Sequence, residues 1–93
     1  MNFGKYLEKC LKSHDISLNS AANMLGLNRG DLYHIIDSKR KLKPETFKTL
    51  IESIGFSSEE KRKLTKLFFS SFYGEKNFER MEYIIESLNS FSD

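Results

Sequence analysis

Two clusters of polar side chains in this 93-residue chain have types and spacings that could do chemistry. In the first, His34 lies between Asp31 and Asp37 at three-residue steps, so an imidazole and two carboxylates could exchange protons as a general acid and base. The second cluster is cationic, and ammonium and guanidinium groups bind phosphate or carboxylate oxygens. Its members follow one another closely in the sequence: Lys39, Arg40, Lys41 and Lys43.

The first cluster has a simpler explanation than catalysis, because three-residue steps also place residues on the exposed side of one short helix. The chain has two His, one Cys and no glycine-rich phosphate loop. The two His do not have metal-binding spacing. Cys10 has no second Cys for an internal disulfide and falls at core spacing, so we interpret it as a small buried hydrophobic residue. We therefore expect no enzyme activity, no metal and no cofactor.

Positive charge is concentrated around the second cluster. The whole chain has a net charge of +2, whereas residues 26–43 carry five Lys and Arg against two Asp. Residues 44–93 carry seven basic residues against nine acidic ones. A local basic patch attracts polyanions such as nucleic acids.

The length suits one small domain. The chain has no signal-peptide apolar region and no apolar run near the ~20 residues of a membrane span, so we expect a cytoplasmic protein with no membrane partner.

Helical periodicity predicts the elements that hold these clusters. Ser17 can cap a short helix over 18–25, Gly26 can take the left-handed conformation at its end, and Leu27 can fill the following turn. Asn28 can cap a second helix. The residues that this helix directs inward are Leu32, Ile35 and Ile36. The residues left facing outward are Arg29, Gly30, Tyr33, His34 and Asp37.

Apolar residues at three- and four-residue steps predict four more helices, so the expected fold class is all-α. Their expected ranges are about 3–13, 44–53, 58–73 and 78–90, with Ser57 and Asn77 as the caps of the last two. Pro44 suits the first position of its helix, and Gly55 is expected to end it. Ser57 and Glu60 have the spacing of a capping box. His14, just after the first helix, is expected on the surface.

The segment 17–43 resembles the helix-turn-helix of the Cro/C1-type (XRE) family of bacterial and phage DNA-binding regulators. The matching residues, in that family's spacing, are Ala22, Gly26, Leu27, Leu32 and Ile35. The resemblance extends less specifically over residues 3–72. It implies a compact five-helix, lambda-repressor-like bundle as a DNA-binding domain over residues 1–74. A C-terminal sixth helix over residues 75–93 would complete the core, dimerise or act as a linker.

The resemblance also implies a function, the sequence-specific binding of double-stranded DNA by a transcriptional regulator. Of the two signs of regulation, it favours a repressor. The helix over residues 28–37 would enter the major groove of the operator. By register with the family and proximity, the base-contacting candidates are Arg29, Gly30, Tyr33, His34 and Asn28. The phosphate-contacting candidates are Ser17, Asn19, Ser20, Lys39, Arg40, Lys41 and Lys43. Asp31 is expected to assist as a cap of this helix rather than to contact a base, because the DNA phosphates repel a carboxylate.

Several positions depart from the family pattern. Leu18 stands where a DNA-contacting Gln usually begins the second helix, Gly30 has no side chain to read a base, and Ser38 replaces a loop glycine. Leu11 and Ile36 replace an Arg–Glu pair, so we expect packing to link those helices. Leu18, Gly30 and the apolar C-terminal part of the chain motivate an alternative function, a protein-interaction module on the same fold that does not read DNA.

The C-terminal part of the chain is rich in large apolar side chains. One interpretation is that a sixth helix folds back on the core, and another is that these side chains form a homodimer interface, since exposed they would promote aggregation. A dimer would also read two half-sites of an operator. In a third alternative, the segment leads into a C-terminal sensor domain or binds a protein partner. The dimer-interface candidates are Phe69, Phe72, Phe78, Met81, Ile84, Ile85, Leu88 and Phe91.

Overall fold

Five α-helices form the part of the chain that the structure, a computed structural model, describes, residues 2–72. They are α1 (Phe3–Ser13), α2 (Leu18–Leu25), α3 (Arg29–Ile36), α4 (Pro44–Ser53) and α5 (Ser58–Phe72). Residues 2–72 contain no strand, which confirms the all-α class for this part. The expected sixth helix lies outside the described residues. None of the helices in residues 2–72 is long and apolar enough to cross a membrane.

The ends of the helices follow local side-chain chemistry, with one exception. Pro44 occupies the first turn of α4, as expected. The expectation that Gly55 ends this helix was wrong, because Gly55 does not adopt the left-handed conformation. Among residues 2–72, Gly26 is the glycine with a positive φ. Helix α4 ends at Ser53, and its C-cap residue is Ile54, whose backbone is extended (φ −109°, ψ 136°). The extended backbone carries the chain out of the helix while the side chains of Ile54 and Phe56 both stay buried.

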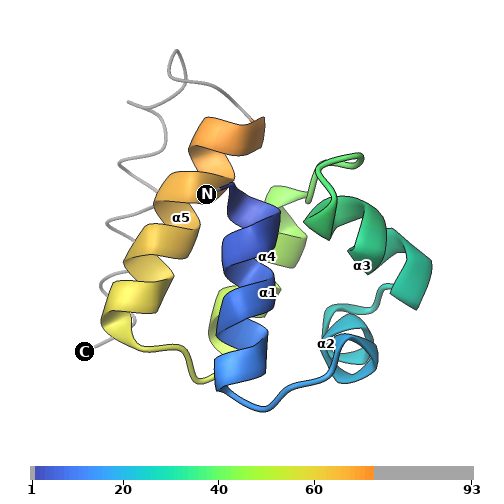
Figure 1. Ribbon diagram of the computed structural model, residues 1–93, viewed down its shortest axis with the longest axis horizontal. Coiled ribbons are helices and arrows are strands. Elements are labelled where there is room, and N and C mark those ends of the chain that lie inside the picture. Colours follow the sequence, from blue (N-terminus) through green and yellow to red (C-terminus); the bar gives the residue numbers. More distant parts are fainter. Residues whose placement is uncertain (1, 73–93) are drawn as a thin grey trace.

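Helix α1 lies at the centre of the arrangement. Figure 1 shows α5 on one side of α1, α2 and α3 on the other, and α4 behind it. Helix α1 contacts both α3 and α5. Its contact with α3 is close at Gly4, where a Cβ atom would lie 2.1 Å from the backbone oxygen of Ile36. Leu11 and Ile36 are both buried, as expected if packing links these two helices. Helix α1 thus holds α3 in place against the core.

A cluster of phenylalanines joins α1, α4 and α5. The rings of Phe47 and Phe68 stack with centroids 4.2 Å apart and planes 4° apart. Phe3 meets Phe47, Phe68 and Phe72 edge-on, with centroids 5.9, 5.7 and 5.5 Å away. These contacts bring together residues from three helices, and each ring of the cluster is at most 8 % exposed.

Two of the dimer-interface candidates belong to this core. Phe72 packs edge-on against Phe3 and Phe68, and Phe69 packs edge-on against Phe68. Their exposed fractions are 8 % and 3 %, because α5 turns a wide apolar face toward α1 and α4. The other six candidates, from Phe78 to Phe91, lie outside the described residues, so a dimer interface stays a prediction.

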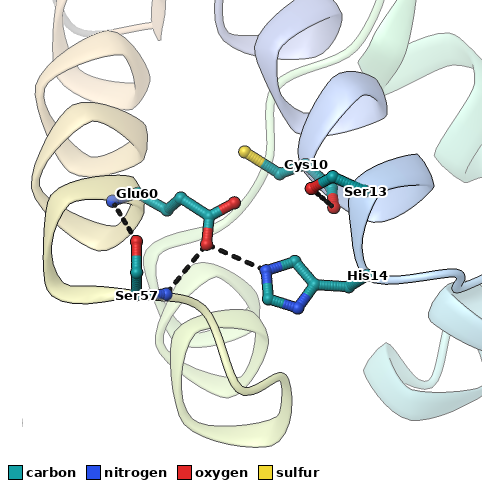
Figure 2. Close-up of polar contacts among 5 residues, drawn as sticks. All are labelled: Cys10, Ser13, His14, Ser57 and Glu60. Carbon is teal, nitrogen blue, oxygen red and sulfur yellow. Dashed lines mark hydrogen bonds and ion pairs between the residues drawn. The ribbon is translucent and has the colours of Figure 1, made fainter.

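The C-terminal end of α1 is tied to the first turn of α5 by a polar contact (Figure 2). His14 Nε2 lies 2.8 Å from Glu60 Oε1. The imidazole also packs against the ring of Phe56 in a T-shaped contact, with the ring centroids 5.4 Å apart. The side chain of His14 is 29 % exposed, so it lies partly at the surface as expected, but the fold brings α5 against this end of α1 and half-buries the imidazole. The Ser57 N–H donates to Glu60 Oε1 at 2.8 Å and the Glu60 N–H donates to Ser57 Oγ at 3.1 Å, which confirms the capping box.

These hydrogen bonds set the ionisation of Glu60. Burial by itself would raise its pKa, but hydrogen bonds from the Ser57 amide, His14 and the Cys10 thiol lower the pKa from an ordinary 4.5 to about 2. Because the unfolded chain has the ordinary value, ionised Glu60 contributes its full stabilisation above about pH 4.5. The contribution is lost as the pH falls through about 2.

We expect Glu60→Gln to lower the free energy of unfolding by about 1–2 kcal/mol at neutral pH, since the amide keeps the capping geometry but loses the charge. The difference from the wild type should shrink as the pH falls from about 4.5 to about 2. Urea denaturation followed by circular dichroism at several pH values measures both effects. Glu59→Gln is the matched control, because Glu59 is an exposed carboxylate in the same first turn. An equal loss in both variants would contradict the role given to Glu60.

Candidate nucleic-acid interface

The segment from Ser17 to Asp37 forms α2, a tight turn and α3, referred to below as the α2–turn–α3 unit. Ser17 caps α2 through its Oγ atom, which accepts a hydrogen bond from the Ser20 N–H at 3.1 Å. Gly26 ends α2 in the left-handed conformation, with φ of 67°. The Leu27 N–H donates to the Ala22 carbonyl at 2.9 Å, and the half-buried Leu27 side chain packs against the core. These local contacts confirm the expected turn.

Helix α3 begins at the cap that the sequence predicts. The Oδ1 atom of Asn28 accepts a hydrogen bond from the Asp31 N–H at 2.8 Å. This bond engages the carbonyl of the Asn28 amide, so its NH₂ group is the part that remains to donate to a base. The helix covers residues 29–36, with Asn28 and Asp37 as its caps, within the expected 28–37.

The two faces of α3 differ as expected. Leu32, Ile35 and Ile36 are at most 2 % exposed and fix the helix on the core. The opposite face is open to solvent and carries Arg29, Gly30, Tyr33, His34 and Asp37. At Gly30, a Cβ atom would meet the Asn28 amide oxygen at 3.4 Å within the described residues and would otherwise point into open space. Four of the five base-contacting candidates therefore lie on one accessible face of α3. The fifth, Asn28, is the cap residue at the start of the helix.

Arg29 and Tyr33 interact on this exposed face. The Cζ atom of Arg29 lies 5.3 Å from the centroid of the Tyr33 ring, and its Nη2 atom donates to the Tyr33 hydroxyl at 3.3 Å. Exposed cation–π contacts contribute about 0.5–1 kcal/mol, enough to favour one group of side-chain conformers. Arg29 therefore has fewer conformers to give up when its guanidinium binds an acceptor such as a guanine edge or a phosphate.

The loop after α3 presents the cationic cluster. Lys39, Arg40, Lys41 and Lys43 are exposed, while Leu42 between them is 2 % exposed and anchors the loop in the core. Ser38 adopts a φ of 62°, so this position has the left-handed backbone that glycine takes most easily. The serine therefore adopts a left-handed backbone despite its Cβ atom.

Arg40 has a partner that sequence reasoning did not predict. Its Nη1 atom donates to the Oδ1 atom of Asp31, in the first turn of α3. The two residues are nine positions apart across the end of a helix, and neither helical spacing nor a motif signals such a pair. Asp31 therefore contributes its backbone N–H to the Asn28 cap and its carboxylate to the loop, whereas only a capping role was expected.

The phosphate-contacting candidates of α2 lie at its exposed N-terminal end. Ser17, Asn19 and Ser20 are all exposed, and the Ser17 Oγ atom donates to Ser20 Oγ at 3.0 Å. Leu18 differs from them because its side chain is half-buried against the core. Leu18 therefore contributes to packing in this chain.

The remaining reactive groups lie away from this face or apart from one another. Among residues 2–72, no hydrogen bond joins His34 to Asp31 or Asp37. Cys10 is 3 % exposed, and burial raises the pKa of its thiol to about 11, so the thiol stays protonated and weakly nucleophilic. The interpretation of Cys10 as a buried hydrophobic residue is confirmed. No group of three His, Cys, Asp or Glu side chains suited to a metal ion occurs in the described part of the chain.

No protein-family model, curated protein or solved structure matches this chain. Its function is therefore inferred from the side chains of the α2–turn–α3 unit and the loop that follows it.

Proposed function

We propose that this protein is a sequence-specific DNA-binding regulator of the Cro/C1 type that places α3 in the major groove. The five helices would then be that family's five-helix bundle. The observation that carries the proposal is the exposed polar face of α3, anchored from behind by three buried residues and followed by an exposed basic loop. In this arrangement base edges meet the helix and phosphates meet the loop.

Each part of the interface has a separate task in this proposal. Arg29 donates to a guanine, the commonest specific contact of arginine in the major groove. Tyr33 and His34 lie farther along the same exposed face and reach neighbouring bases or phosphates. The loop cations hold the backbone and fix the orientation of the domain without reading sequence. A homodimer in the cytoplasm would read two half-sites and act as a repressor by occupying its operator.

Fluorescence anisotropy against a random-sequence DNA duplex tests the basic part of this proposal. We expect binding that weakens steeply between about 50 mM and about 200 mM salt, because bound cations release counterions from the duplex. Changing Lys39, Arg40 and Lys41 together to Ala should weaken binding about tenfold or more and lower the salt slope by about 2.

The matched control changes Lys61, Arg62 and Lys66 to Ala, so it also removes two lysines and one arginine. These residues belong to α5, which lies on the opposite side of α1 from α2 and α3 (Figure 1). We expect this control to bind nearly as the wild type does. Equal losses in the two triple variants would mean that net charge alone drives binding and that the loop is not the contact surface. No binding by the wild type at low salt would contradict the proposal as a whole.

Selection of duplexes from a random pool tests whether sequence is read. If α3 reads bases, the wild type should enrich one motif with a guanine at a fixed position. Recovery of unrelated sequences after repeated rounds, together with salt-sensitive binding, would reduce the proposal to non-specific DNA binding.

A further inference from the structure

Asp31 and Arg40 form an ion pair within the surface that the proposed function assigns to DNA. Arg40 belongs to the exposed basic loop, and Asp31 lies in the first turn of α3. Their side chains are 48 % and 27 % exposed, so a ligand can reach both groups. Exposed ion pairs contribute little to stability. A DNA phosphate can therefore replace the carboxylate as the partner of Arg40 without a large loss to the fold.

The carboxylate of Asp31 is not required to cap α3. The cap is the hydrogen bond from the Asp31 N–H to Asn28 Oδ1, and an asparagine at position 31 would donate the same bond. What the carboxylate adds is a negative charge inside a region whose other charges are mostly positive. The charge lies at the N-terminal end of the helix that would lead into the groove, where it repels phosphates.

We propose that Asp31 is a specificity-determining residue that competes with DNA phosphates for Arg40. On a random duplex Arg40 stays with Asp31, so the protein makes one phosphate contact fewer. At the operator, base contacts hold α3 in one register and bring a phosphate against Arg40, which then exchanges its partner. Asp31 thereby lowers non-specific affinity more than operator affinity. This inference rests on the proposed function.

A double-mutant cycle with Asp31→Asn and Arg40→Ala tests the exchange, with random-sequence duplex as the probe. Asp31→Asn should raise the affinity about fivefold at about 50 mM salt and steepen the salt slope by about 0.9, the value of one further phosphate contact. In the Arg40→Ala background the same change should raise the affinity clearly less than about fivefold and leave the salt slope nearly unchanged, because the cation that Asp31 restrains is gone and only the repulsion by the carboxylate is removed.

Asp37→Asn is the control for charge alone. It removes one carboxylate from the exposed C-cap of α3, at the opposite end of the helix from Asp31. We expect it to change the affinity for random duplex less than about twofold. Arg40 is exposed and Asp31 is half-buried. An ion pair that solvent can reach contributes little to stability, so all variants should keep the wild-type thermal midpoint within a few degrees. Arg40→Gln replaces Arg40→Ala in the cycle if the latter does not fold.

The outcomes separate this inference from the function on which it rests. If Asp31→Asn raises the affinity equally with and without Arg40, or no more than Asp37→Asn does, Asp31 acts only as a general negative charge and the inference is overturned. The proposed function would survive that result, because the wild type would still bind duplex DNA. A wild type that binds no duplex at low salt overturns both.

Discussion

Replacing Gly4 with alanine is expected to lower the free energy of unfolding by about 3 kcal/mol or more. The added Cβ atom would lie 2.1, 2.6 and 2.7 Å from the backbone O, C and Cα atoms of Ile36. These atoms belong to the main chain of α3, so no change of side-chain rotamer relieves the overlap. Helices α1 and α3 would have to separate. Alanine's better helix propensity, worth about 1 kcal/mol, is too small to compensate.

Gly30→Ala is the matched control, since it is the same substitution in an exposed helical position. A Cβ atom there meets the Asn28 amide oxygen at 3.4 Å, an ordinary contact distance. We expect this variant to be more stable than the wild type by about 0.5–1 kcal/mol. Urea denaturation followed by circular dichroism measures both free energies. A Gly4→Ala protein as stable as the wild type would show that α1 and α3 are not in backbone contact.

Replacing Phe47 with alanine is expected to cost about 3–5 kcal/mol. The ring is 2 % exposed, stacks on Phe68 with centroids 4.2 Å apart, and receives the edge of Phe3. Truncation removes the apolar contacts of the ring with two other helices and leaves a cavity between them. Since a domain of this size has about 5–10 kcal/mol of stability in total, much of the native population would be lost at physiological temperature.

Phe47→Leu distinguishes loss of the stacked ring from loss of volume. Leucine keeps most of the apolar volume, and we expect it to cost about 1–2 kcal/mol. Thermal and urea denaturation of the three proteins give the comparison. If alanine and leucine at position 47 were equally destabilising at about 1 kcal/mol, the stacked pair would not be a main support of the core.

Local sequence determined the helices, most of their caps and the direction of their faces, with the end of α4 as an exception. Ser17, Asn28 and Ser57 each cap a helix through a backbone N–H three residues later, and this contact depends on little beyond the residues that make it. Helical periodicity likewise placed Leu32, Ile35 and Ile36 inside and left the polar face of α3 outside. The exposed candidates of the interface could be predicted for the same reason, since burial of one face of a short helix exposes the other.

Only the tertiary structure decided which of these elements touch. Gly4 approaches Ile36, Phe47 stacks on Phe68, and His14 reaches Glu60, and each pair joins residues that are at least 21 positions apart. Such contacts follow from the packing of whole helices, and a single sequence has no periodicity or motif that marks them. Asp31 and Arg40 are closer to each other in the sequence, but the left-handed turn at Ser38 lies between them. The geometry of this pair therefore also depends on how the loop packs through Leu42. The sequence by itself therefore determined which groups α3 and its loop present to solvent, whereas the fold decided that one of the loop's cations already has a carboxylate partner.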